Sequence, residues 1–163
     1  MNCQIRPAIE SDLEAINAIF NHYVLTSTCT WQDEPISMAD RRTWWAEKAG
    51  RFPILVAVVG GRVVGFTTAG QFRPRSGYRY SAENSIYLDP DACGKGIGKA
   101  LLTALLAELK SRGFHTVIAS MSDDQEASIR LHRSLGFEQV GHMRETGFKF
   151  GRWHSGVFMQ KML

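Results

Sequence analysis

A glycine-rich turn, Cys93–Lys99, stands directly before the most regular helical pattern of this 163-residue chain. A predicted strand, Glu83–Leu88, precedes the turn, and Leu101, Leu105 and Leu109 follow it four residues apart. Glycine lets a backbone approach a ligand closely, and the first turn of a helix has free N–H groups at the positive end of its dipole. This arrangement predicts a strand, a turn and a helix whose N-terminus binds a phosphate group.

Two common phosphate-binding motifs do not fit the turn. A Walker A loop requires glycine where Cys93 stands and serine or threonine where Ala100 stands. A Rossmann loop requires glycine or alanine where Lys99 or Leu101 stands. The turn alone leaves two interpretations open: a different phosphate site, or glycines that only permit a tight connection.

The remaining pattern predicts one mixed α/β (α+β) domain over residues 1–163, in the order β-αα-βββ-α-β-α-ββ. Strands are expected at Cys3–Arg6, Ile54–Val59, Val63–Ala69, Glu83–Leu88, His115–Ser120, Val140–Phe148 and Trp153–Met162. Helices are expected from Ser11 to about Leu25, after Ser37, from Ile97 to before Gly113, and from Asp123 or Asp124 to before Gly136. Ser11 and Glu14 match a capping box at the start of the first helix.

Composition narrows the class of protein. The apolar run Ile54–Val59 is too short to span a bilayer, and the N-terminus has no signal-peptide pattern, so we expect a cytoplasmic protein. The three cysteines are far apart and show no CxxC spacing, which argues against a disulfide framework and against a metal site. A net charge of +3 without basic clusters argues against nucleic-acid binding.

Several segments together resemble a known superfamily. Ile86–Leu102 is similar to the acetyl-CoA motif of the GNAT superfamily, and Ala127–Phe137 is similar to the second half of that motif. One branch of the superfamily is matched more closely, the phosphinothricin and methionine sulfoximine (L-amino acid) N-acetyltransferases. The segments that resemble it are Phe72-Arg73-Pro74, Glu83–Tyr87 and Gly147–His154. The resemblance implies a GNAT acyl-CoA N-acyltransferase fold with a mixed central sheet, a homodimer, and direct transfer of acetyl from acetyl-CoA to the α-amine of a small amino-acid-like substrate.

The resemblance also implies which residues hold acetyl-CoA. They are Ile86, Tyr87, Leu88, Gly94, Lys95, Gly96, Ile97, Gly98, Lys99, Gln125 and Ser128. Backbone N–H groups around Tyr87 and Leu88 are expected to hold the thioester carbonyl. Two positions depart from the superfamily: Cys93 replaces the usual arginine or glutamine, and Gln125 replaces a frequent asparagine. We therefore expect the pyrophosphate to depend more on backbone N–H groups than it does in related proteins.

Amide formation needs a neutral amine and a stabilised leaving group, and two residues are candidates for these tasks. Glu83 is the expected base, acting directly or through water, while the alternative is a solvated carboxylate at a strand end. His132 matches the family's acid position, and the alternative is a histidine that only packs in the core. The residues expected to bind the acceptor are Trp31, Phe72, Arg73, Pro74, Arg75, Glu83, Asn84 and Ser85.

The arginines in this set indicate the chemistry of the acceptor, because guanidinium groups bind carboxylates and phosphinates in bidentate fashion. Trp44 and Trp45 are expected to pack in the core or in an interface. Two other hypotheses remain at this stage. One is a GNAT enzyme for a different amine, such as a polyamine, an aminoglycoside or a protein N-terminus. The other is a CoA-binding protein without catalysis.

Overall fold

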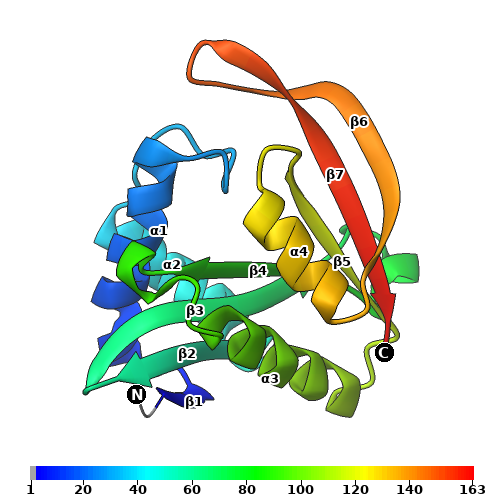
Figure 1. Cartoon of the computed structure of the whole chain (residues 1–163). Coiled ribbons are helices and arrows are strands. Elements are labelled where there is room, and N and C mark those ends of the chain that lie inside the picture. The colour runs from blue at the N-terminus through cyan, green and yellow to red at the C-terminus, as the bar shows by residue number, and fades with distance from the viewer. Residues whose placement is uncertain (1–2) are drawn as a thin grey trace.

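The computed structural model describes residues 3–163 and has the predicted order of elements (Figure 1). The strands are β1 (Cys3–Pro7), β2 (Ile54–Val59), β3 (Arg62–Gln71), β4 (Ser81–Leu88), β5 (Thr116–Ser122), β6 (Glu138–Lys149) and β7 (Arg152–Met162). The helices are α1 (Leu13–Thr26), α2 (Met38–Lys48), α3 (Ile97–Ser111) and α4 (Glu126–Ser134). Short 3₁₀ turns lie at η1 (Glu10–Asp12), η2 (Ser76–Tyr78) and η3 (Pro90–Ala92).

The strands form one seven-stranded sheet in the order β1-β2-β3-β4-β5-β7-β6. β4 and β5 run parallel and pair over Ser81–Glu83 and Thr116–Ile118, while the other neighbouring pairs are antiparallel. Both strands continue past this short pairing, and there they diverge (Figure 1). The sheet is therefore open in its middle, between the second half of β4 and the second half of β5.

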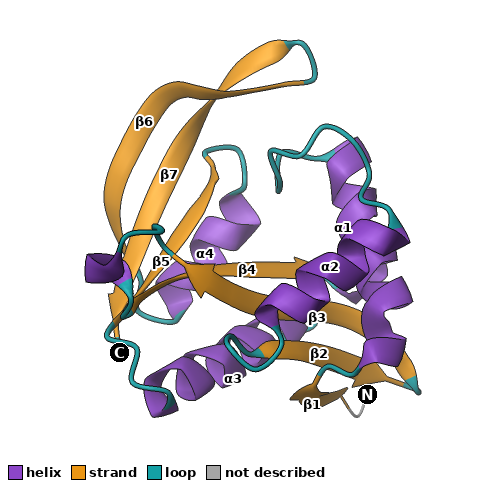
Figure 2. Ribbon diagram, turned by 180° about the vertical axis from the view of Figure 1, so that it is seen from behind, coloured by secondary structure: helices purple, strands orange, loops and turns teal. Residues whose placement is uncertain are grey.

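Helices cover both faces of the sheet (Figure 2). On one face, α1 and α2 enclose a small core in which Leu13 and Ile16 pack near Phe66, with Trp44 and Trp45 packed against it. The other face carries the larger core, into which α3 buries Leu101, Leu102, Leu105 and Leu109 completely. Their four-residue spacing in the sequence is the amphipathic pattern that predicted this helix. The two tryptophans are partly buried against the smaller core, which agrees with a packing role.

Two of the predicted helix starts are wrong. The Ser11–Glu14 capping box does not form, because the carboxylate of Asp12 accepts from the Ile9 N–H at 2.9 Å and pairs with Arg6 at 2.6 Å. The Arg6 guanidinium holds the pKa of the Asp12 carboxyl below its usual range. By contrast, the predicted Ser37 cap is confirmed, since its hydroxyl accepts from the Asp40 N–H.

The second wrong start is that of α4. Gln125 rather than Asp123 or Asp124 occupies the N-cap position, and no side chain caps this helix. The Asp124 carboxylate instead accepts from the Thr28 hydroxyl at 2.6 Å, in the loop that follows α1. A tertiary contact has therefore taken the place of the local cap.

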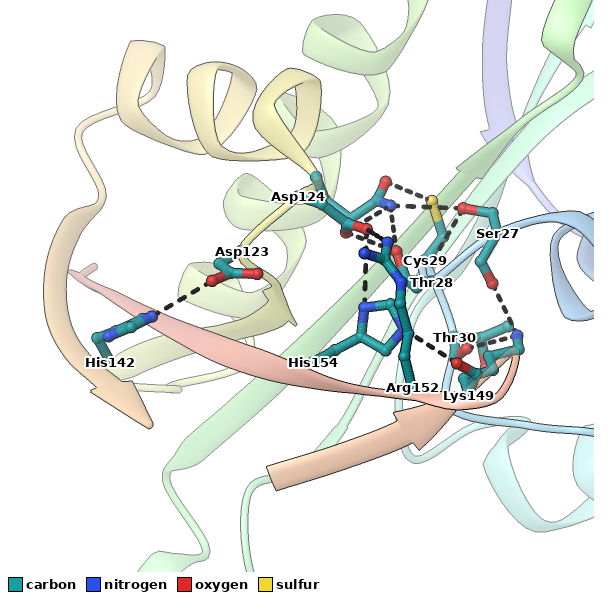
Figure 3. A network of polar contacts seen from close by, with 11 residues as sticks. Ser27, Thr28, Cys29, Thr30, Asp123, Asp124, His142, Lys149, Arg152 and His154 are labelled. Atoms are coloured by element: carbon teal, nitrogen blue, oxygen red, sulfur yellow. Dashed lines mark hydrogen bonds and ion pairs between the residues drawn. The ribbon is translucent and has the colours of Figure 1, made fainter. Parts of the chain in front are cut away.

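The hairpin of β6 and β7 extends beyond the body of the protein (Figure 1). Lys149 connects this hairpin to the loop after α1 through hydrogen bonds (Figure 3). The Lys149 side chain is buried, and its Nζ donates to the carbonyl oxygens of Ser27 at 2.7 Å and Thr30 at 2.8 Å. The buried His154 donates from Nε2 to the Lys149 carbonyl at 3.0 Å, and its Nδ1 faces Asp124 at 3.9 Å. Three segments far apart in the sequence thus meet in one polar network.

A close steric contact joins the same loop and hairpin. The ring of Trp31 lies directly on the backbone of Gly147, where an added Cβ would come within 2.4 Å of a ring carbon. The ring also contacts His154 with a centroid separation of 5.9 Å. Glycine at position 147 is therefore required by the close approach of an aromatic ring rather than by a turn.

We expect Lys149→Met to lower the free energy of unfolding by about 3 kcal/mol, because it leaves two carbonyl groups without their charged donor. Denaturant unfolding followed by circular dichroism measures this change. The matched control is Arg152→Ala in the same hairpin, whose guanidinium is exposed and 3.9 Å from Asp124. That variant should change stability by less than about 1 kcal/mol, and equal losses in the two variants would refute the role given to Lys149.

A second expectation concerns Gly147. Gly147→Ala should destabilise the protein by about 1–3 kcal/mol, because its methyl group overlaps the Trp31 ring. In the same strand, a Cβ at Gly141 would meet its nearest neighbour at an ordinary 3.6 Å, so Gly141→Ala serves as the control. Thermal unfolding of both variants compares the two sites. A Gly147→Ala protein as stable as the control would contradict the packing of Trp31 described above.

Candidate functional site

A groove of about 520 Å³ runs from the glycine turn toward the opening between β4 and β5. Its outer end is formed by Gly94, Gly96, Gly98 and Lys99, and its inner end by residues of β4, α4 and the loop after α1. The turn, the β4 strand and α4, which were predicted separately from the sequence, therefore line one continuous surface.

The glycine turn has the geometry of an anion site. Gly94 and Gly96 adopt φ angles of +74° and +78°, a conformation that other residues rarely take. Gly96 is the N-cap of α3, and no side chain caps the helix, so its first N–H groups stay available to a ligand. At Gly98 an added Cβ would lie 3.3 Å from Leu88 and 3.4 Å from Leu131, so glycine lets these two side chains pack closely against the start of α3. These features fit a pyrophosphate held by backbone N–H groups.

The two lysines of the turn differ in their surroundings. Lys95 Nζ donates to the Asp91 carbonyl at 2.7 Å, which ties its ammonium group back to η3. Lys99 lines the groove and is exposed. Cys93 also lines the groove, and its thiol lies 4.0 Å from the Tyr23 hydroxyl. Lys99 thus supplies positive charge at the outer end of the groove.

The backbone of β4 offers hydrogen-bond donors to the opening. The Asp89 N–H and the Ser81 carbonyl bond toward β3, so backbone groups of odd-numbered residues point to that side. The N–H groups of Ile86 and Leu88 consequently point toward β5, beyond the stretch where the two strands pair. These groups correspond to the donors expected around Tyr87 and Leu88 for a thioester carbonyl.

The alternation of β4 separates side chains that the sequence grouped together. Tyr87 packs against Phe20 and Phe66, so Glu83 and Ser85 share with it the face covered by α1 and α2. Asn84 points to the opposite face, where it contacts α4. Glu83 and Asn84 therefore approach the opening from opposite sides.

A smaller pocket of about 90 Å³ continues the groove inward. Asn84, Ser85 and His132 line it together with Ala119 and Met121 of β5. The pocket and the groove also share lining residues: Cys29, Ile86, Tyr87, Gln125 and Ser128. The two cavities therefore form one path from the glycine turn to the point where β4 and β5 separate.

His132 lies at the end of this path and is 2 % exposed. Its Nδ1 is 2.8 Å from the Ser128 carbonyl oxygen, so Nδ1 carries the hydrogen and donates it. Its Nε2 is 3.0 Å from Asn84 Nδ2 and accepts from that amide. Burial lowers the pKa of His132, which keeps the ring neutral. The predicted inward orientation is confirmed, and both ring nitrogens have protein partners.

The sequence did not indicate Cys29 and Tyr23 as site residues, although both line the groove. Cys29 donates its thiol hydrogen to Gln125 Oε1 at 2.8 Å, and burial raises the pKa of the thiol. Gln125 Nε2 donates in turn to Thr28 Oγ1 at 2.6 Å. Tyr23 donates its hydroxyl hydrogen to the Leu88 carbonyl at 2.6 Å. These contacts join distant segments, and no local motif marks them.

Glu83 is half-buried near a cationic cluster but does not line the inner pocket. Lys48 lies on the same face of the sheet and donates from Nζ to the Ala69 carbonyl at 2.6 Å. Burial and the nearby Arg41 charge lower the pKa of Lys48 to about 8, while the Glu83 carboxylate opposes this shift. The carboxylate of Glu83 therefore lies in the electrostatic field of the half-buried Lys48.

The structure does not bring the predicted acceptor residues together in one cavity. Arg73, Pro74 and Arg75 are exposed in the loop between β3 and β4 and line neither the groove nor the pocket. The Arg73 guanidinium stacks over Phe72 at 5.1 Å from the ring centroid. Trp31 lies against the hairpin instead. Of the eight residues expected to bind the acceptor, Asn84 and Ser85 line the inner pocket.

Comparison with known proteins identifies the family. Residues 16–137 match the Acetyltransferase (GNAT) family. The chain is 41% identical over 162 residues to an L-methionine sulfoximine/L-methionine sulfone acetyltransferase of Pseudomonas aeruginosa, covering 98% of this chain and 94% of that protein. It is 40% identical over 164 residues to a phosphinothricin N-acetyltransferase of Alcaligenes faecalis, covering 99% of this chain and 83% of that protein.

A solved structure gives the same assignment. The crystal structure of a GNAT superfamily phosphinothricin acetyltransferase from Sinorhizobium meliloti in complex with AcCoA superposes with a TM-score of 0.97. It is 42% identical and covers 100% of this chain and 89% of that chain. The expected fold is confirmed by this similarity and by the seven-stranded mixed sheet. The chain belongs to the GNAT family and is an acetyl-CoA-dependent N-acetyltransferase.

Proposed function

We propose that this enzyme transfers an acetyl group from acetyl-CoA to the α-amine of a small amino-acid-like substrate of the methionine sulfoximine, methionine sulfone or phosphinothricin type. The observation that carries the proposal is the continuous path from an uncapped helix N-terminus to the opening between β4 and β5. Relatives that share 40% or more of their residues with this chain bear these substrates in their names.

The fit to acetyl-CoA rests on this chain's own backbone. The first N–H groups of α3 would hold the pyrophosphate, and Lys99 would add charge from the exposed side. Gln125 and Ser128 line the groove where the pantetheine arm would pass, although the Gln125 amide is already bonded to Cys29 and Thr28. When bound, the cosubstrate supplies an activated acetyl group to the inner pocket.

The acetyl group would pass directly from acetyl-CoA to the amine while both are bound to the enzyme, and the residues of the site fit this reaction. The reaction forms an N–C bond and breaks a C–S bond, while the amine loses a proton and the sulfur gains one. Glu83, on the face opposite Asn84, would take the amine proton directly or through water. The Ile86 and Leu88 N–H groups would donate to the carbonyl oxygen as it gains negative charge. Cys29 takes no part as a nucleophile, because its protonated thiol is bonded to Gln125.

Other acceptors are less compatible with the charge of the chain. Three arginines crowd residues 73–79, and they would repel a polyamine or an aminoglycoside. Acetylation of a protein N-terminus is the remaining rival function. A screen of amino acids, polyamines, aminoglycosides and peptides with acetyl-CoA decides among them. Turnover on amino-acid analogues supports the proposal, whereas turnover confined to another class, or binding without turnover, overturns it.

We also propose that the enzyme acts as a cytoplasmic homodimer without nucleic-acid or membrane partners. Exposed aromatic side chains on the hairpin support self-association: Phe148, Phe150 and Trp153 are each more than half exposed. Within residues 3–163, no helix is long and apolar enough to cross a membrane. Analytical ultracentrifugation tests the dimer.

Glu83→Gln should lower kcat by about 100-fold or more, because the amide no longer accepts the amine proton. Release of the CoA thiol, measured with a thiol reagent, follows the rate. The control is Glu138→Gln, which changes an exposed carboxylate at the start of β6 and should leave kcat unchanged. If Glu83→Gln retained full kcat, the base would have to be another group.

We propose that Arg73 and Arg75 bind the acidic group of the acceptor from the exposed loop outside the two cavities. Arg73→Ala and Arg75→Ala should then each raise KM for the amino-acid-like substrate about tenfold with little change in kcat, because a charged hydrogen bond is lost. Arg79→Ala is the matched control in the same loop, since its guanidinium donates to the Ser76 carbonyl and Arg79 is not among the residues expected to bind the acceptor. Steady-state kinetics with varied acceptor distinguish the three variants. Unchanged KM in the first two variants would remove these arginines from the acceptor site.

A further inference from the structure

We propose that Asn84, positioned by His132, is the side chain that contacts the leaving sulfur, and that Asn84 Oδ1 accepts the thiol hydrogen of the CoA product. This inference rests on the proposed function and assigns one atom a task within it. His132 then acts as a positioning residue rather than as the proton donor at the sulfur.

The first observation is that His132 has no free nitrogen. Nδ1 donates to the Ser128 carbonyl and Nε2 accepts from Asn84 Nδ2. The ring also packs edge-on against Phe137 with a centroid separation of 4.9 Å. To donate a proton to the sulfur, His132 would have to break its bond with Asn84 and become charged inside the protein.

The second observation is an unpaired atom. Asn84 is 7 % exposed, and its Oδ1 is buried without a hydrogen-bond partner among residues 3–163. Leaving a buried carbonyl unpaired destabilises the protein, so this orientation needs an explanation. His132 enforces this orientation, because its Nε2 lone pair requires the amide nitrogen of Asn84 on its side. Oδ1 is thereby kept available to a donor in the inner pocket, which Asn84 lines.

The chemistry of the reaction identifies the donor. An acetyl thioester brings neither an N–H nor an O–H group at its sulfur, so Oδ1 has no donor there before transfer. Transfer forms the N–C bond and breaks the C–S bond; the amine proton passes to Glu83, and the departing thiolate takes a proton from water, which leaves CoA as a thiol. Asn84 shares its face of β4 with Ile86 and Leu88, which line the cosubstrate groove, whereas Glu83 lies on the other face. Asn84 therefore lies on the side from which the sulfur departs.

Binding of two cosubstrate analogues tests this assignment without turnover. CoA carries the thiol, and desulfo-CoA lacks the sulfur but keeps the pantetheine amides. Calorimetry should show that the wild-type enzyme binds CoA about threefold or more tighter than desulfo-CoA. In Asn84→Leu the two affinities should become equal. Equal weakening of both ligands in this variant would mean that Asn84 contacts a pantetheine amide, which overturns the inference.

Two variants at position 132 separate positioning from acid catalysis. The carbonyl of glutamine accepts from Asn84 as the imidazole does, so His132→Gln should keep the preference for CoA and most of kcat. His132→Leu offers no acceptor and should lose both. A His132→Gln enzyme as slow as His132→Leu, with the thiol preference intact, would restore the acid role and overturn the inference.

A measurement on the unmodified enzyme guards against misfolded variants. The side-chain amide resonance of Asn84 should shift in nitrogen–proton NMR spectra when CoA is added, and should stay unchanged with desulfo-CoA. Equal shifts with both ligands contradict the inference but leave the proposed function standing. Failure of the wild-type enzyme to bind CoA at all would refute the proposed function itself, so the two failures are distinguishable.

Discussion

The separation of β4 from β5 is the constraint on which the rest of the structure depends. The two strands pair over three residues each and then diverge, although β5 stays paired with β7 along its whole length. Backbone groups of Asn84, Ile86 and Leu88 therefore face a gap in the middle of the sheet, where unpaired polar groups are costly. A pantetheine arm with its two amides would satisfy such groups as a third strand would. The interruption of strand pairing thus leaves backbone groups free, and these free groups form the binding site.

A second feature holds the walls of this opening in place. The loop after α1 crosses one end of it, and the charge of Lys149 fixes that loop by two carbonyl groups. Asp124, at the entrance to α4, binds the same loop through Thr28. The loop after α1 therefore joins α4, which carries His132, to the hairpin, which carries Lys149.

Local pattern in the sequence was enough to predict the order of the elements, the glycine turn and the inward orientation of His132. Each of these depends on residues within one or two turns of each other, as with the leucines of α3. The errors arose where a distant partner outcompeted a local one: Arg6 holds Asp12 in place of the Ser11 cap, and Thr28 holds Asp124 in place of the cap of α4. Lys149 and Cys29 could not be assigned from sequence, because their partners lie on segments far along the chain.

The grouping of Glu83, Asn84 and Ser85 as acceptor-binding residues shows a subtler limit. They are consecutive, but a β-strand directs neighbouring side chains to opposite faces. Glu83 consequently faces the side of α1 and α2, and Asn84 faces α4 and the cosubstrate groove. In the proposed reaction, the attacking amine and the leaving sulfur lie on different sides of the same carbonyl carbon. A single strand beside this carbon can place one residue near the amine and the next near the sulfur. This requires that β5 diverge from β4, because the reacting groups occupy the space between the two strands.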